Sequence, residues 1–468
     1  MRVVGIKFAG LDETSGPLTW AQEYMWKMIH MASPGTRSQF NMAAYVRIPD
    51  GVTFQQVVMA FHSLIERHEG YRTVYRADAG GALEQHVLGA GAVEIDVVDL
   101  PEPFAADSRQ AEELFNELLS EEFDLGKEWP YRATLLCLAG APALLVVVLS
   151  HLTADGSSSA LLQRELTTLL LKCGTGRDMD DHGTVVQQLH IAAHQRSAAG
   201  QAGSERSMRH WERVLSRYYR SGQERARHEG SLHRVRTVSM TSRRLEAFAS
   251  MTARRCNTTP STVFIAATAF AYATITGRAG LILEVACSNR TRNWAETHGT
   301  MFQFGIAEFP ATGAGFDVIV KGSAAAALSA YACSQYDPVA LEALRQRLSG
   351  GTGHYSRLPA IPFVINDIVG RHLTAADSNI SPDQAHRHPP AFSEFGEGDP
   401  ETGGYAFYLG YHRAKGGDLR IGLEFDTRIL SCAEAVGCLK AIDGLLLKAG
   451  RADLSLAEAQ NIVQSCLP

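Results

Sequence analysis

Long hydrophobic runs are missing from this sequence. The longest apolar run, residues 141–149, is far shorter than the roughly 20 residues that a membrane-spanning helix needs. The N-terminal residues MRVVGIKFAGLDETSG contain neither a long apolar stretch nor the small-residue cleavage site of a secretion signal. The usual signs of membrane insertion and export are therefore lacking, and we expect a cytoplasmic protein without membrane contact.

Paired cysteines are missing as well. The chain has 8 cysteines among 468 residues, and none of them forms a C-x-x-C pair. Such pairs mark zinc and redox sites, so we predict reduced thiols, no disulfide framework and no metal site. The formal net charge of −6 argues against a nucleic-acid binder, because nucleic acid attracts positively charged surfaces.

The sequence does contain alternating strand-like and helix-like segments, over a length that suits two domains. In the first part we predict strands at 42–48, 71–76, 83–88, 93–97, 131–138 and 144–149, and helices at 53–67, 108–122 and 157–171. In the second part we predict strands at 234–240 and 281–287 and helices at 242–254 and 261–275. This pattern predicts an α/β (α+β) fold with mixed sheets. A polar stretch separates the two predicted lobes, 1–178 and 179–468.

One strand is followed by residues that can do chemistry. Residues 144–149 are apolar at every position, which predicts an interior strand covered on both faces. His151 comes directly after this strand, and Asp155 and Gly156 follow. The glycine permits a tight turn, and Ser157 or Ser158 can cap the next helix. A histidine suits proton transfer because its pKa is near neutrality, although an ordinary histidine in an exposed turn is the alternative.

SHLTADG, residues 150–156, resembles the His-His-x-x-x-Asp-Gly signature of condensation domains from nonribosomal peptide synthetases. Further segments resemble motifs of that family in the same order: GPLTWAQEYMW (16–26), LIERHEGYRT (64–73), EEFDLGKEWPYRATLL (121–136), NTTPSTVFIAATAFAYATITG (257–277), ACSNRTR (286–292), GTMFQF (299–304) and LEFDTRIL (423–430). Two positions depart from the family pattern: Ser150 replaces the first histidine, and Gln303 stands where asparagine is common.

The resemblance implies two chloramphenicol-acetyltransferase-like lobes that form a V with a central tunnel, with bridging loops near 299–310 and 350–404. It also implies a reaction in which an acyl or aminoacyl group leaves a phosphopantetheine thioester on an acyl or peptidyl carrier protein. A small-molecule acceptor, an amine by default or a hydroxyl, attacks that thioester. The enzyme itself would bind no cofactor, since the carrier brings the phosphopantetheine.

The resemblance also assigns roles to individual residues. His151 would be catalytic, and the N–H of Gly156 at a helix start is our candidate oxyanion donor. Asp155 would form a structural salt bridge with Arg290, with Arg292 as the second candidate partner. The substrate tunnel would include five further residues: Ser150, Trp20, Gln22, Gln303 and Asn366. For Trp20, packing in the core is the alternative.

The segment 205–236 is rich in arginine, and Arg217 and Arg220 are candidates for docking an acidic carrier protein. A solvated surface helix is the alternative. Because no adenylation or carrier segment is recognisable, we expect a free-standing condensation enzyme that acts in natural-product biosynthesis, such as that of an antibiotic. An acyl-CoA-dependent acyltransferase is the second hypothesis, favoured by GEG within 393–400. A non-catalytic docking platform is the third, suggested by Ser150.

Overall fold

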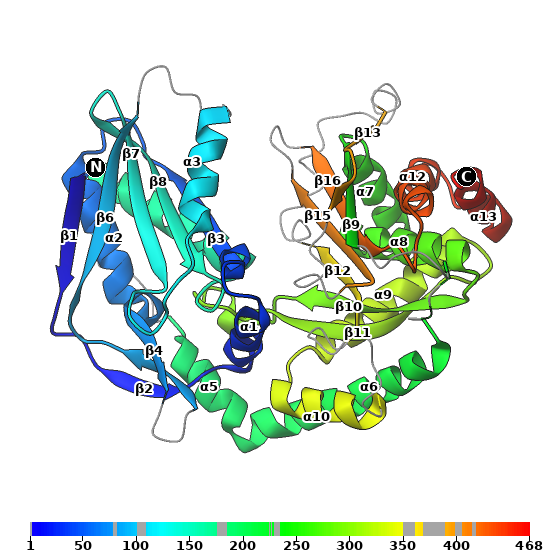
Figure 1. Cartoon of the computed structure of the whole chain (residues 1–468), viewed down its shortest axis with the longest axis horizontal. Helices are drawn as coiled ribbons and strands as arrows, with labels where there is room; N and C mark the ends of the chain where they lie inside the picture. The colour runs from blue at the N-terminus through cyan, green and yellow to red at the C-terminus, as the bar shows by residue number, and fades with distance from the viewer. Residues whose placement is uncertain are drawn as a thin grey trace. The chain divides into compact units, whose positions relative to one another are not determined.

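The computed structural model describes residues 2–77, 82–100, 109–175, 185–223, 225, 227–228, 235–349, 361–367, 389–397, 405–413 and 418–468. The chain forms two compact units. Unit 1 comprises Met1–Ala202 and Ser288–Phe302, and unit 2 comprises Gly203–Cys287 and Gln303–Pro468. Figure 1 shows the elements of each unit along the chain.

This division differs from the predicted one in two respects. The boundary lies after Ala202 rather than after residue 178, and Ser288–Phe302 belongs to unit 1. The first difference has a physical cause in helix α5 (Gln188–Arg196), which packs against strand β2 (Thr14–Pro17). The side chain of Gln195 on this helix also accepts a 2.9 Å hydrogen bond from the backbone N–H of Trp20. The polar stretch that marks a boundary in the sequence therefore precedes a helix of unit 1.

Unit 1 is built on a mixed five-stranded sheet with the order β1-β6-β7-β8-β3. Its strands are β1 (Arg2–Phe8), β3 (Asn41–Arg47), β6 (Gly91–Leu100), β7 (Tyr131–Leu138) and β8 (Ala141–Ser150). Strands β6 and β7 run parallel, and the other neighbours run antiparallel. A smaller antiparallel sheet pairs β2 with β5 (Leu83–Val87) and β5 with β4 (Thr73–Ala77).

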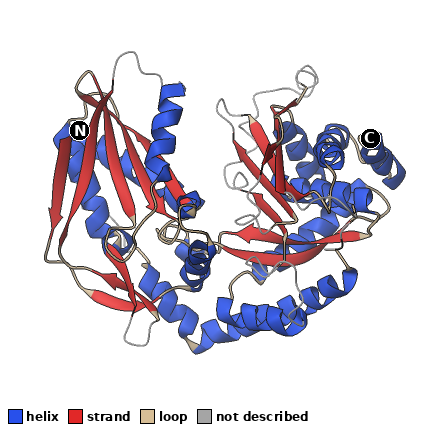
Figure 2. Cartoon of the chain, viewed as in Figure 1, coloured by secondary structure: helices blue, strands red, loops and turns tan. Residues whose placement is uncertain are grey.

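Helices cover both faces of the larger sheet of unit 1 (Figures 1 and 2). Alternate residues of β8, Leu145, Val147 and Leu149, pack into a core with helices α2 (Phe54–Arg67) and α4 (Gly156–Thr175). The intervening Val146 and Val148 pack on the opposite face with helix α3 (Arg109–Ser120). An apolar run thus becomes an interior strand covered on both sides, as predicted.

Unit 1 contains further helices among its described residues. They are helix α1 (Trp20–Met31) and the short 3₁₀ helices η1 (Arg37–Phe40), η2 (Glu69–Arg72) and η3 (Arg292–Trp294). Thr19 caps α1 by accepting a hydrogen bond from the N–H of Gln22, whose side chain bonds back to the N–H of Thr19. This capping box fixes the start of the helix at Trp20.

Unit 2 contains a mixed sheet with eight strands in its described residues. Their order is β11-β10-β12-β15-β16-β9-β13, and β14 also pairs with β9. The strands are β9 (Val235–Ser242), β10 (Gly280–Cys287), β11 (Gln303–Pro310), β12 (Phe363–Asp367), β13 (Ala391–Phe392), β14 (Gly396–Glu397), β15 (Phe407–Arg413) and β16 (Leu419–Asp426). Strand β12 runs parallel to β10 and β15, and the other pairs are antiparallel.

Helix α8 (Pro260–Thr276) is the central helix of the unit 2 core, since it is buried along nearly its whole length. Thr259 caps it, Pro260 occupies the first turn, and Gly277 ends it with a φ of 68°. The other helices that the structure describes here are α6 (Ala198–Ser221), which begins in unit 1, and α7 (Leu245–Cys256), α9 (Phe316–Ala332), α10 (Pro338–Ser349), α12 (Cys432–Ala449) and α13 (Leu456–Ser465). The predicted mixed α/β character is therefore confirmed in both units.

Each predicted strand and helix has an observed counterpart, but many observed elements were not predicted. Strand β1 is one of them, and α6 covers Ala198–Ser221, where the sequence interpretation offered a surface helix only as the alternative to a docking segment. Although α6 is rich in arginine, one narrow face of the helix is apolar, and Trp211, Leu215 and Tyr218 on that face are buried. In the described part of the chain, no helix combines the length and the apolar character needed to cross a membrane.

Candidate active site

His151 lies in the turn that follows β8, and the backbone holds it there. Its N–H donates a 3.0 Å hydrogen bond to the carbonyl oxygen of Phe40, next to β3. Its Nδ1 lies 3.5 Å from the hydroxyl oxygen of Thr300, and its ring centroid lies 6.1 Å from that of Phe302. Burial lowers the pKa of His151 below its ordinary value, although the charge of Asp155 acts in the opposite direction. The imidazole is therefore neutral near pH 7 and able to accept a proton.

Asp155 caps helix α4. Its Oδ1 accepts hydrogen bonds from the N–H groups of Ser157 and Ser158, at 3.0 and 2.9 Å. The sequence interpretation gave this cap to a serine and was wrong on this point. The helix begins at Gly156, so the residue before it has the capping position, and Asp is among the strongest capping residues. The hydroxyl of Ser158 instead donates to the carbonyl oxygen of Gly299 at 2.6 Å.

The second carboxylate oxygen of Asp155 faces the 288–302 segment. It accepts a 2.6 Å hydrogen bond from Nη1 of Arg290 and a 3.1 Å hydrogen bond from the N–H of Met301. Burial opposes ionisation of this carboxyl, but Arg290 and the surrounding donors hold its pKa below the ordinary value. Because both oxygens are already engaged with protein donors, the geometry favours a structural anion over a second base.

Arg290 lies at the centre of these contacts. Its Nη2 donates to the hydroxyl of Ser158 and to the carbonyl of Gly299, both at 2.8 Å, and its side chain is only 5% exposed. The pair that the sequence interpretation proposed, Asp155 and Arg290, is thus brought together. Arg292, its second candidate, is exposed in η3.

Gly156 is the first residue of α4 and is exposed. Among the described residues, none accepts a hydrogen bond from its N–H group, as is usual for the first turn of a helix. A Cβ atom added at Gly156 would meet nothing within 4 Å. The N–H is therefore available to a ligand, and it does not require glycine for space.

The other predicted tunnel residues of unit 1 are engaged with the protein. Ser150 is 3% exposed, and its hydroxyl oxygen accepts a 3.3 Å hydrogen bond from the N–H of Leu152. Trp20 is 3% exposed. Gln22 is 1% exposed, and its amide nitrogen contacts the Tyr75 hydroxyl at 3.2 Å in addition to its role in the capping box. Trp20 and Gln22 are thus buried, and the contacts of Gln22 are hydrogen bonds within unit 1.

The remaining predicted residues lie in unit 2. Gln303 is buried, and its amide donates a 2.9 Å hydrogen bond to the carbonyl oxygen of Tyr336. Asn366 donates to the hydroxyl of Tyr408 at 2.9 Å. Arg217 and Arg220 are exposed on α6, and Arg217 lies 3.1 Å from a carboxylate oxygen of Glu308.

Some predicted features lie outside the described residues. Arg234 of the basic segment and Gly398 of GEG are among them, as is most of the predicted loop region 350–404.

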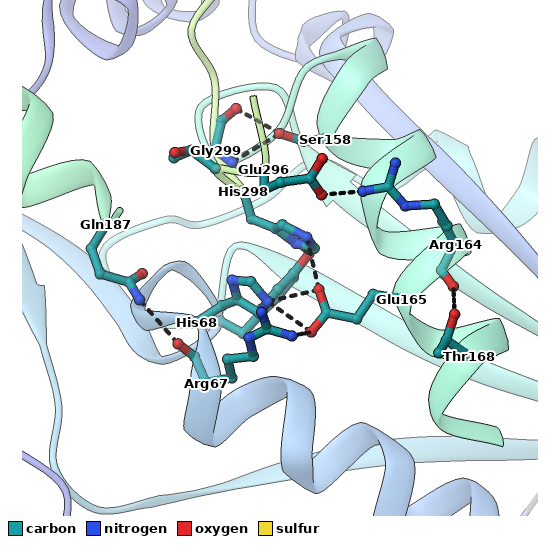
Figure 3. A network of polar contacts seen from close by, with 12 residues as sticks. Arg67, His68, Ser158, Arg164, Glu165, Thr168, Gln187, Glu296, His298 and Gly299 are labelled. Carbon is teal, nitrogen blue, oxygen red and sulfur yellow. Dashed lines mark hydrogen bonds and ion pairs between the residues drawn. The ribbon is translucent and has the colours of Figure 1, made fainter. Parts of the chain in front are cut away.

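Sequence reasoning missed one polar cluster of unit 1 altogether. It joins His68, Glu165 and His298, which come from the end of α2, from α4 and from the 288–302 segment (Figure 3). His68 belongs to the RHE segment quoted above, but no local pattern links it to a glutamate 97 positions later. Only the folded structure reveals this cluster.

Comparison with known proteins identifies the family. A family model described as the condensation domain matches residues 12–302. The phosphinothricin tripeptide synthetase PhsC of Streptomyces viridochromogenes is 37% identical over 170 residues, which are 36% of this chain and 15% of PhsC. An isonitrile lipopeptide synthase of Mycobacterium tuberculosis is 29% identical over 207 residues, which are 43% of this chain and 8% of that protein. Each match therefore covers only a small part of the relative's own length.

Solved structures agree on the fold. The condensation domain of the Monacolin K polyketide synthase MokA matches with a TM-score of 0.69 and 17% identity, over 95% of this chain and 99% of that one. At this identity the likeness shows the fold alone. The family model, in contrast, covers more than half of the sequence and includes His151, Asp155 and Arg290. The chain therefore belongs to the condensation-domain family, whose members are acyltransferase-type enzymes of nonribosomal peptide and polyketide synthesis.

Proposed function

We propose that this protein forms an amide bond by transferring an acyl or aminoacyl group from a carrier-protein phosphopantetheine thioester to an amine. The observation that carries the proposal is the end of β8, where a buried strand presents a neutral histidine beside the start of α4. The residues that a condensation reaction needs lie within six positions of each other in the chain, from His151 to Gly156.

The chemistry assigned to these groups balances without a covalent enzyme intermediate. The imidazole of His151 takes the proton that the amine loses as its nitrogen attacks the thioester carbonyl. The N–H of Gly156 stabilises the negative charge that develops on the carbonyl oxygen. Collapse of this intermediate breaks the C–S bond, and the proton held by His151 passes to the departing pantetheine sulfur. The products are the amide and a free phosphopantetheine thiol.

A serine nucleophile is not part of the proposal. The hydroxyl of Ser158 is 2.8 Å from Nη2 of Arg290 and 2.6 Å from the carbonyl oxygen of Gly299, and the residue is buried. Such a hydroxyl stabilises a loop and lacks the adjacent general base that an acyl-enzyme mechanism requires.

We propose further that the 468-residue chain acts on a separate carrier protein. The exposed arginines of α6, including Arg217 and Arg220, support this docking role because carrier proteins present acidic surfaces.

Mass spectrometry of loaded carrier protein tests the proposal. Purified protein is mixed with an acyl-loaded carrier and an amine, and with acyl-CoA and the same amine in a parallel arm. We expect amide from the loaded carrier with the wild type and at least a hundredfold less with His151→Ala. Amide from acyl-CoA alone would favour a CoA-dependent transferase. Equal product with His151→Ala would remove the histidine from the mechanism, and no product despite carrier binding would favour a docking platform.

A further inference from the structure

The cluster of His68, Glu165 and His298 lies within unit 1 and is assigned no part in the reaction described above. Glu165 accepts hydrogen bonds from His68 Nε2 at 2.9 and 3.0 Å and from Arg67 Nη1 at 2.9 Å. Its Oε2 also lies 3.2 Å from Nε2 of His298. His68 and His298 are both buried, and their rings stack with centroids 3.9 Å apart and an interplanar angle of 20°. Figure 3 shows the three side chains meeting at the Glu165 carboxylate.

The protons directed at Glu165 can be assigned with protein groups alone, while the buried Nδ1 of His68 has no hydrogen-bond partner among the described residues. The Glu165 carboxylate is an acceptor only, so both imidazoles donate to it through Nε2–H. His298 then has an unprotonated Nδ1, which accepts from the Tyr71 hydroxyl at 2.9 Å. Burial opposes ionisation of Glu165, but the two histidines hold its pKa well below its ordinary value. Burial and the neighbouring His68 lower the pKa of His298 to about 4, so it is neutral near pH 7.

A metal ion bound by the same three residues fits this geometry less well. A bound zinc would replace both Nε2 protons and would draw its ligands toward one point from tetrahedral directions. Two rings stacked nearly in parallel instead present their nitrogens alongside each other. The guanidinium of Arg67 also pairs with the Glu165 carboxylate, and its positive charge makes this carboxylate a weaker ligand for a metal cation. The observations therefore favour a hydrogen-bonded clamp.

The clamp holds a strip of backbone that leads directly to the candidate active site. His298 binds Glu165, and the next residue, Gly299, exchanges two hydrogen bonds with the Ser158 hydroxyl at 2.6 and 2.8 Å. Thr300 follows with its hydroxyl 3.5 Å from Nδ1 of His151. The strip therefore meets α4 at two points seven residues apart, which lie on one face of a helix.

We propose that Glu165, acting through His298, is a positioning residue for His151. The clamp fixes where residues 298–301 lie along α4, and thereby places Thr300 against the catalytic imidazole and the Met301 N–H on Asp155. Mispositioning of this strip leaves substrate affinity largely intact and slows the chemical step, because small displacements of catalytic groups cost rate steeply. This inference rests on the proposed condensation function.

The chain provides a matched control for the test. Arg164 and Glu296 form an ion pair that joins the same helix to the same segment, but their side chains are 62% and 68% exposed. Exposed ion pairs contribute little to stability, so loss of this one leaves the strip in place. Glu296→Gln thus removes a neighbouring link between the same two elements without touching the buried clamp.

Two variants remove the clamp, and one is designed to restore it. Glu165→Gln removes the shared carboxylate. His298→Phe keeps a ring to stack on His68 but has no nitrogen for Glu165. His298→Gln keeps an amide N–H that can donate to Glu165. We expect kcat for amide formation to fall on the order of tenfold in Glu165→Gln and His298→Phe, with KM changed less than twofold. His298→Gln should recover most of the lost rate, and Glu296→Gln should match the wild type.

Hydrogen–deuterium exchange of the peptide covering 297–303 gives a readout that does not depend on turnover. We expect faster exchange in Glu165→Gln and His298→Phe and no change in Glu296→Gln. Faster exchange in a protein that makes no amide even as wild type would refute the proposed function while leaving the clamp. Unchanged exchange with unchanged kcat in both clamp variants would overturn the inference. So would a rise in Tm on adding Zn²⁺ to the wild type that is absent in His298→Phe, because that result would replace the clamp with a metal site.

Discussion

Two carboxylates of helix α4 bind the same 288–302 segment in different ways. Asp155, at the start of the helix, is held by the permanent charge of Arg290 and by three backbone N–H groups. Glu165, farther along, is held by Arg67 and by two imidazoles. Guanidinium and amide donors keep their protons at any ordinary pH, whereas the imidazole of His298 gains a second proton in acid, with a pKa of about 4. One attachment is therefore insensitive to mild acid, and the other is linked to it.

Burial should make the Asp155 attachment the stronger of the two. Asp155→Asn leaves the Arg290 cation buried without a counter-charge, and we expect a loss of about 3–5 kcal/mol in stability. Glu165→Gln should cost less, about 1–3 kcal/mol, because Glu165 and Arg67 are 15% and 25% exposed. Chemical denaturation of both variants measures the difference. An Asp155→Asn protein with wild-type stability but no turnover would assign the aspartate to catalysis instead.

The start of α4 should also contribute an oxyanion donor, which the Glu165 end does not. Gly156→Pro removes the N–H, and proline is well accepted at the first position of a helix. We expect kcat to fall about 10²- to 10³-fold with little change in Tm.

Gly156→Ala is the control for that variant. It keeps the N–H, and its Cβ meets nothing within 4 Å, so we expect nearly normal rates. Equal loss of rate in the two variants would point to steric exclusion of substrate rather than to a missing hydrogen-bond donor.

Acid should destabilise the folded protein through the buried His298 rather than through Asp155 at first. The pKa of His298 is about 4 in the folded protein, against 6.5 for the free side chain, so the unfolded chain binds more protons between these pH values. Stability therefore rises with pH across this window and is lost as the pH falls through it. The difference in pKa corresponds to about 3 kcal/mol between pH 7 and pH 4.

Denaturation of the wild type and of His298→Phe across that pH range isolates this contribution. The free energy of unfolding of the variant should depend less on pH, because phenylalanine at position 298 has no nitrogen that can bind a proton in either state. Parallel curves for the two proteins would show that His298 keeps its ordinary pKa.

The smallest effect is expected from the arginines of α6. Glutamate substitutions at Arg217 and Arg220 should raise KM for the loaded carrier a few-fold at low salt, with kcat and Tm unchanged. Kinetics at two ionic strengths measure this effect. If KM changes with neither the substitutions nor the salt concentration, these arginines take no part in docking the carrier.

The sequence was sufficient for the features that local pattern encodes. The apolar run of β8 predicted an interior strand, and motif resemblance led to His151 and to the pairing of Asp155 with Arg290. The helix cap was misassigned, because serine and aspartate are both good caps and only the fold decides which one precedes the first turn. Gln22 shows a similar ambiguity, since a buried amide can belong to a tunnel or to a capping box.

The Glu165 clamp could not be predicted because its partners come from segments far apart in the chain. His68 and Glu165 are 97 positions apart, and a pairing of this kind leaves no periodicity to detect. Helix α6 illustrates a different problem, because its many charged residues suggested a solvated surface helix and gave no sign of its narrow buried face.

The discontinuity of unit 1 has a consequence for how the protein is made. Arg290 lies 135 residues after Asp155 in the chain. The ribosome therefore finishes α4 well before it makes the arginine that balances the charge of Asp155. At the usual rate of synthesis this delay is on the order of 10 s. During that interval Asp155 must remain hydrated, and the end of β8 has no partner strip to cover it. A nascent chain of this protein therefore leaves the turn that carries His151 unfinished until the segment between β10 and β11 has emerged.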